Sequence, residues 1–329
     1  MSVALAVPVA SWAVLSVAAF LFLWLDRYQL DLVPWLAGVA AWGFAVPAVL
    51  AAAGARLPHL LGAPGAGSPV PELWLALPAL AVALPCLGVA LPVAAVARSR
   101  FLEGPSSGAV FGVMAGLAFS LGMHLLVVTR AAWQPSAAAL VFLSLLHAAV
   151  GASLGAGIGL ARLAAPPQLR IPAVLGAVTA AAGLGALLVF GAVSCWASWG
   201  ERSVACNLAL AGVGLTVLLG VFGFSISYER RVLAGQLAEE VRLGVLPRWV
   251  AEVMPSYRRR IRSDWWGRRD ERREILRLLA GLAFRKHRLR NLPEEKARLY
   301  GLEVGRLRQR ARVLVALPPT STPAAPGTE

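Results

Sequence analysis

Three ionisable side chains lie in or at the edge of long apolar stretches, where they could take part in chemistry: Glu72, His124 and His147. Ionisable groups at membrane depth are rare and often functional. A carboxylate can act as a general base toward water, and Glu72 with the two imidazoles could hold a divalent metal such as zinc in a three-ligand arrangement. The other interpretation, which we prefer, makes Glu72 an interfacial residue and both histidines buried imidazoles bonded to backbone carbonyls or water.

Seven apolar segments, each long enough to cross a bilayer, contain or border these residues. They lie at 4–25, 32–54, 72–97, 107–129, 137–161, 172–197 and 204–227. A transmembrane helix needs about 20 mostly apolar residues, and only five acids precede Tyr228. Because lipid cannot satisfy free backbone groups, the segments should be helices. The sequence predicts an all-α, polytopic membrane bundle of about seven transmembrane helices.

A basic region follows the last span. It holds 23 of the 31 Lys and Arg residues but 12 of the 17 acids. Positively charged loops stay on the cytoplasmic side, so we expect the C-terminus inside and the N-terminus outside. The predicted domains are a transmembrane bundle at 1–227, a basic cytoplasmic helical region at 228–316 and a disordered tail at 317–329.

The cytoplasmic region should contain three helices. The first continues the last span from Tyr228 to Leu243 and ends before Gly244 and Pro247. A second, at about 270–289, places Ile275, Leu278, Leu279 and Leu282 at helical spacing. A third begins near Pro293, with two acids in its first turn, and carries Leu299, Leu302, Val304 and Leu307.

The arginines of this region predict contact with the anionic membrane leaflet. Arg258, Arg259, Arg260 and Arg262 precede Trp265 and Trp266, a composition typical of an interfacial anchor. None of the usual nucleic-acid-binding signatures occurs, so nucleic acid is not an expected partner. A helical hairpin with solvated charges is the plain alternative, and it is compatible with lipid contact.

Small residues and cysteines mark further features of the bundle. Four glycines of the fifth span (Gly151, Gly155, Gly157 and Gly159) would let another helix approach closely, so this helix should be central. The third span carries Pro78, Pro85 and Pro92 and should bend. Cys195 and Cys206 flank a loop placed outside, where a disulfide is permitted. Two separate buried thiols are the alternative.

Several stretches of the chain resemble the PrsW family of intramembrane proteases, which is related to the CAAX prenyl-protease group. They are 70–78, 101–119 and 146–155 in the bundle, with 237–246 and 282–289 in the cytoplasmic region. The resemblance covers roughly residues 71–312. It implies a helical membrane fold and a site built from three short motifs, E-E-x-x-K, F-x-x-x-E and H-x-x-x-D.

This sequence departs from all three motifs. The first keeps Glu72 but lacks the second glutamate and the lysine. The second keeps Phe119, with Met123 in place of the acid, and the third keeps His147, with Gly151 in place of the acid. Most of the acid and base groups needed to activate water and stabilise an oxyanion are therefore replaced.

Three functional hypotheses follow. The first is a catalytically degenerate PrsW-like protein of a bacterial-type inner membrane, which binds membrane proteins or partner helices. The second is an active peptidase that uses Glu72 as base, with His147 and His124 polarising the carbonyl or holding a metal. The third is a small-solute transporter or channel, suggested by the proline-broken third span.

Overall fold

The structure is a computed structural model, and it is helical wherever it is described. The described residues are 33–60, 88–97, 102, 104–130, 137–164, 171–186, 203–256, 259–260, 269–290, 292 and 294–316. The helices are α2 (Val33–Leu60), α4 (Pro105–Arg130), α5 (Ala137–Ala164), α7 (Ser203–Arg242), α8 (Arg248–Val253), α10 (Arg269–Leu289) and α11 (Glu294–Ala316), with further helical segments Gly88–Ala97 and Ile171–Ala186. These ranges contain no strand, so the all-α prediction is confirmed for them.

Three helices are long and apolar enough to span a membrane. The apolar stretches are Pro105–Leu125, Leu140–Leu163 and Val204–Arg242. Shorter apolar helices cover Pro34–Val49, Gly88–Ala97 and Ile171–Ala186. These coincide with parts of predicted spans, whereas the first predicted span, 4–25, lies outside the described residues. A helical membrane protein is thus supported, and the count of seven spans stays a prediction.

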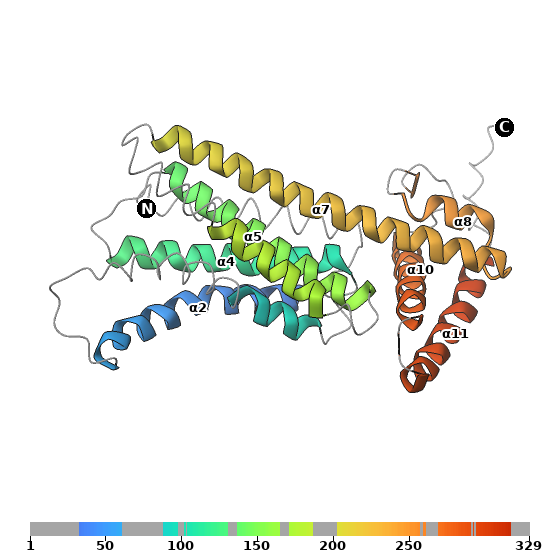
Figure 1. Cartoon of the computed structure of the whole chain (residues 1–329). Helices are drawn as coiled ribbons and strands as arrows, with labels where there is room; N and C mark the ends of the chain where they lie inside the picture. Colours follow the sequence, from blue (N-terminus) through green and yellow to red (C-terminus); the bar gives the residue numbers. More distant parts are fainter. Residues whose placement is uncertain are drawn as a thin grey trace, which may run out of the picture.

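The helices form two groups joined by α7 (Figure 1). In the first group α4 packs against α5 and α2, and α5 packs against α7. The long helix α7 runs past the end of this bundle, and α8, α10 and α11 gather around its C-terminal part. We call α8, α10, α11 and α7 from Tyr228 onward the cap.

Helix α7 ends where the sequence predicts. Gly244 has a positive φ of 66°, a conformation that glycine adopts without a steric penalty. Its amide donates to the carbonyl of Val241 at 3.0 Å, and the amide of Val245 donates to that of Glu240 at 2.9 Å. This pair of bonds is the Schellman ending, which satisfies the last carbonyls of a helix. Pro247 then starts α8.

Each group has its own apolar core. Phe111, Phe142 and Leu154 are fully buried in the bundle. In the cap, the predicted stripe of α10 at 275, 278, 279 and 282 is buried with Leu237 of α7. A third, small cluster joins bundle and cap through Leu163, Val232 and Phe284. Because α7 contributes to the bundle, the cap and the joint, it fixes the cap to the bundle.

Candidate functional site

Helices α4 and α5 contact each other backbone to backbone. A Cβ atom on Gly112 would lie 1.8 Å from the carbonyl oxygen of Gly151, and one on Gly108 would lie 2.0 Å from that of Gly155. The reciprocal positions are equally closed, since a Cβ on Gly151 would lie 2.1 Å from the Gly112 oxygen. Only glycine fits at such contacts. The prediction that the glycine-rich fifth span admits a close neighbour is confirmed, and its central position is confirmed by the contacts of α5 with α4, α7 and α10.

This packing places His147 against α4. A Cβ on Gly116 would lie 2.1 Å from the His147 carbonyl oxygen, so the two backbones touch at this level. The imidazole hydrogen-bonds through Nδ1 to the carbonyl of Leu143 at 2.8 Å. Its ring also lies 5.2 Å, centroid to centroid, from that of Phe119. His147, which is half-buried, therefore makes the backbone hydrogen bond expected of a structural histidine.

His124 differs from His147 in its hydrogen bonding. It is 3% exposed, and neither ring nitrogen has a hydrogen-bond partner in the structure. The hydroxyl of Ser120, one turn earlier on α4 and also buried, has none either. The two imidazoles are near enough to interact electrostatically. The prediction that the histidines bond to backbone carbonyls or water is met by a carbonyl for His147. For His124 the structure shows no carbonyl partner, and bonding to water stays a prediction.

The described residues do not complete a metal site or a general-base site around these histidines. No group of three His, Cys, Asp or Glu side chains converges within the described part of the chain. Glu72, the predicted base and third ligand, lies outside it. A catalytic zinc uses three protein ligands, so the two histidines alone do not make a zinc site.

The predicted disulfide falls partly within the structure. Cys206 lies half-buried near the start of α7 and is disulfide-bonded. Cys195 lies outside the described residues. Pairing of Cys206 with Cys195 stays a prediction.

A buried carboxylate at the start of α4 was not predicted from the sequence. Glu229 of α7 is 4% exposed and accepts hydrogen bonds from the backbone amide of Ser106 at 2.9 Å and from its hydroxyl at 2.7 Å. The first amides of a helix have no partner within it, and the positive end of the helix dipole favours an anion. This contact ties α7 to α4 where the bundle meets the cap. We call it the Glu229 latch.

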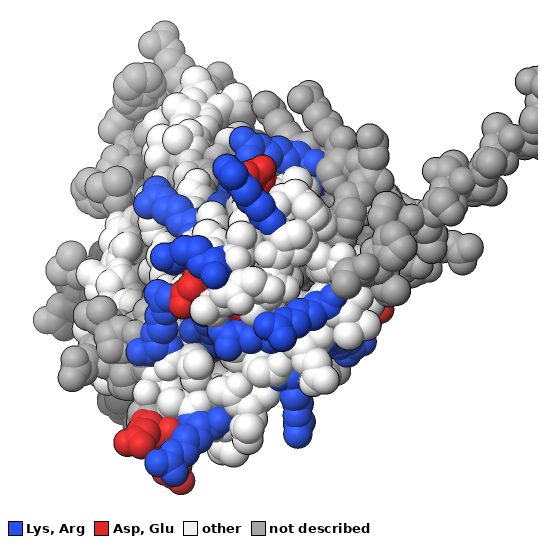
Figure 2. Space-filling model, turned by 90° about the vertical axis from the view of Figure 1, so that its right-hand side faces the viewer, with Lys and Arg blue, Asp and Glu red and all other residues white. Residues whose placement is uncertain are grey.

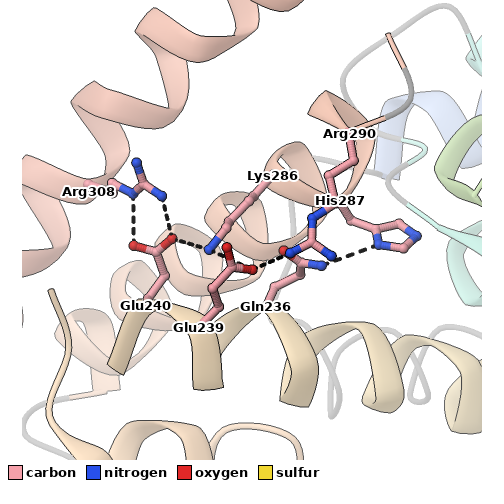
Figure 3. Close-up of polar contacts among 7 residues, drawn as sticks. All are labelled: Gln236, Glu239, Glu240, Lys286, His287, Arg290 and Arg308. Carbon is pink, nitrogen blue, oxygen red and sulfur yellow. Dashed lines mark hydrogen bonds and ion pairs between the residues drawn. The ribbon is translucent and has the colours of Figure 1, made fainter. Parts of the chain in front are cut away.

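The cap contains a second buried carboxylate, Glu240, with no exposed side-chain surface. Figure 3 shows how cations from two other helices converge on it. Arg308 of α11 donates to both carboxylate oxygens at 2.8 Å, and the ammonium of Lys286 on α10 lies 2.5 Å from Oε1. The bond to Glu240 raises the pKa of Arg308. A paired fork of this kind is among the strongest charge-assisted contacts.

Neighbouring polar groups extend the cluster. Glu239 lies 3.3 Å from Lys286 and also pairs with Arg290. The amide nitrogen of Gln236 lies 3.5 Å from Nδ1 of His287. Burial and the charge of Arg290 lower the pKa of His287. The plain prediction of a hairpin with merely solvated charges is therefore wrong, because a buried ionic cluster links all three main cap helices.

Comparison with known proteins adds no relative, since no family model, curated protein or solved structure matches this chain. The chemistry of the site therefore rests on its own residues.

Proposed function

We propose that this chain is a multi-pass inner-membrane protein, similar to the PrsW proteases, that has lost hydrolytic activity and binds membrane proteins or partner helices. One observation carries the loss of activity. Gly151 takes the place of the acid in the third motif, and a Cβ there would lie 2.1 Å from the Gly112 carbonyl oxygen. No aspartate can occupy this position unless α4 and α5 separate.

Two further observations support the proposal. Met123 replaces the acid of the second motif directly before His124. The buried carboxylates Glu229 and Glu240 are both occupied by structural partners, the start of α4 and the cations of the cap. Neither is available to activate a water molecule at the histidines.

The proposed topology has seven spans in residues 1–227, an outer N-terminus and a cytoplasmic cap that meets the anionic leaflet through its arginines. A cysteine introduced at Arg202 should react with a membrane-impermeant maleimide added outside intact cells, after the native cysteines are replaced by serine. A cysteine at Arg259 should react only after the cells are opened. Equal labelling of both positions from outside would overturn the topology.

The second candidate function, an active peptidase, is favoured by the unpartnered ring nitrogens of His124. One assay on the purified chain in detergent distinguishes the binding protein from the active peptidase. A transmembrane reporter with a photoreactive residue is incubated with wild type, Glu72→Ala and His147→Ala, with a known intramembrane protease as positive control. We expect the reporter to cross-link to all three forms without being cut. Cleavage by wild type that both substitutions abolish would establish the peptidase, and absence of any cross-link would refute the binding role.

A further inference from the structure

Helix α11 has one face buried in the cap and one face exposed to solvent. Val304, Ala311 and Val315 are buried on the inner face, in the core of the cap. On the opposite side, Leu299 is 69% exposed and Leu302 is 67% exposed. Helical spacing places these leucines about half a turn away from the buried residues. The outer face therefore carries exposed leucines that are not part of the core.

The exposed residues follow a heptad. Leu299, Leu302, Arg306, Gln309 and Val313 are spaced three, four, three and four residues apart, and all five are exposed. We call them the outer stripe. This spacing is that of the a and d positions of a coiled coil, whose side chains insert between those of a partner helix. Val313, at 61% exposed, closes the stripe near the end of α11.

The ionic cluster holds the stripe in place. Arg308 and Val304, on the inner side, fasten α11 to Glu240 and to the core of the cap. Arg285 of α10 pairs with Glu303 at 3.1 Å. A helix already fixed in this way loses little further freedom when a partner binds, which favours association.

The charge of the stripe selects its partner. Arg306, at the centre, has no ion-pair partner within the described structure, and Arg312 lies beside the stripe. Arg298 and Arg310 also flank it but already pair with Glu294 and Glu274 of the same chain. Figure 2 views the cap end-on, and Lys and Arg outnumber acids on the part of this face that is described. The complementary surface is a helix with apolar side chains at its own a and d positions, an acid opposite Arg306 and acids along its flanks.

Two other candidate partners of the outer stripe fit less well. In a second copy of this chain paired in parallel, Arg306 would meet its own equivalent. In an antiparallel pair it would face Leu302 or Gln309 of the copy, neither of which is an acid. Nucleic acid would leave the leucines uncovered by apolar partners.

We propose that the outer stripe of α11 docks an acidic amphipathic helix in coiled-coil fashion. This inference rests on the proposed function as a binding protein, for which it supplies the class of partner. The acidic partner helix would belong to a protein that reaches the cytoplasmic side of the membrane.

The test uses the full chain in nanodiscs and a fluorescent synthetic helix as probe. The probe has leucine at its a and d positions, one central glutamate in an a position, and glutamate at its flanks. Anisotropy should show saturable binding to wild type. Arg306→Glu should weaken binding about a hundredfold or more, because a like-charge contact in an interface costs several kcal/mol. A probe whose central glutamate is lysine should restore binding to Arg306→Glu.

Controls separate this surface from general basic charge. Arg231→Glu, an exposed charge reversal on α7 away from the stripe, should leave binding unchanged, whereas Leu302→Asp should abolish it. No binding to wild type, equal binding to Arg306→Glu, or stronger competition by duplex DNA or by anionic vesicles would overturn the docking proposal. If the probe fails while the reporter still cross-links uncut, only the docking surface is wrong. Cleavage of the reporter would instead refute the proposed function.

Discussion

Replacing Glu240 with alanine should loosen the cap far more than replacing an exposed acid. Glu240 is fully buried, and its carboxylate accepts the fork of Arg308 and the ammonium of Lys286. Lys286 is only 6% exposed, so its charge cannot be hydrated once Glu240 is gone. Removing one partner of a buried pair costs about 3–5 kcal/mol because a buried charge is left uncompensated.

The lower end of this range applies here, for two reasons. Arg308 is 34% exposed and can turn toward water, and Glu239 stays 3.3 Å from Lys286. We therefore expect a loss of about 3 kcal/mol, which corresponds to about a hundredfold increase in the open population of the cap. Glu294 pairs with Arg298 in full solvent contact, with side chains 87% and 80% exposed. Replacing Glu294 with alanine should lower the free energy of cap opening by less than about 0.5 kcal/mol.

Amide hydrogen exchange on peptides from α10 and α11, measured by mass spectrometry in nanodiscs, gives the opening free energy directly. Glu240→Ala should raise exchange in both helices, whereas Glu294→Ala should change it about twofold at most. Adding Lys286→Met to Glu240→Leu should recover part of the loss, since the uncompensated charge is then removed. The buried-charge argument is refuted if Lys286→Met lowers the opening free energy further when added to Glu240→Leu. It is also refuted if Glu240→Ala changes exchange no more than Glu294→Ala does.

Three further predictions concern the bundle and the cap. Gly112→Ala should lower the thermal unfolding temperature in detergent by several degrees, because the new Cβ would meet a carbonyl oxygen at 1.8 Å, whereas Gly220→Ala, with open space around it, should not. Ser106→Ala should destabilise the fold by about 1.5–3 kcal/mol in chemical denaturation, the range for a hydrogen bond to a charged group. Ser144→Ala should cost much less, since that hydroxyl bonds only within its own helix. Lowering the pH below about 6.5 should reduce the protection of cap amides relative to their intrinsic exchange rate, because the folded state keeps the pKa of His287 below its usual 6.5 and the unfolded state takes up the proton first. His287→Gln should abolish this pH effect.

Local rules in the sequence anticipate much of the cap. The end of α7 at Gly244, the buried stripe of α10 and the start of α11 at Glu294 follow from glycine conformation, helical periodicity and acids in a first turn. Each of these depends on residues that are neighbours along the chain or within one helix.

Contacts between segments distant in the sequence could not be predicted from such local rules. Glu240 meets residues 46 and 68 positions away, and Glu229 meets one 123 positions away. No spacing rule selects Lys286, Arg308 and Ser106 among the many cations and hydroxyls of the chain. Leu299 and Leu302 show the same limit, since periodicity places them on one face of α11 but does not say that this face is outside.

The candidate site was located by residue type rather than by geometry. Histidines in apolar spans are uncommon enough to draw attention, and both lie on the packed pair α4 and α5. The sequence could not show that His147 has a carbonyl partner and that His124 has none. That difference depends on how α4 is rotated about its axis, which the glycine contacts determine.

The unbroken course of α7 has a mechanical consequence. Its 40 residues make a rod about 60 Å long, and the Glu229 latch joins this rod to α4 near the point where it leaves the bundle. Helices respond to thinner or thicker bilayers by leaning more or less steeply. A lean of about 5° would carry one end of such a rod sideways by about 5 Å relative to the other, so a change in the tilt of α7 would displace the cap at its C-terminal end.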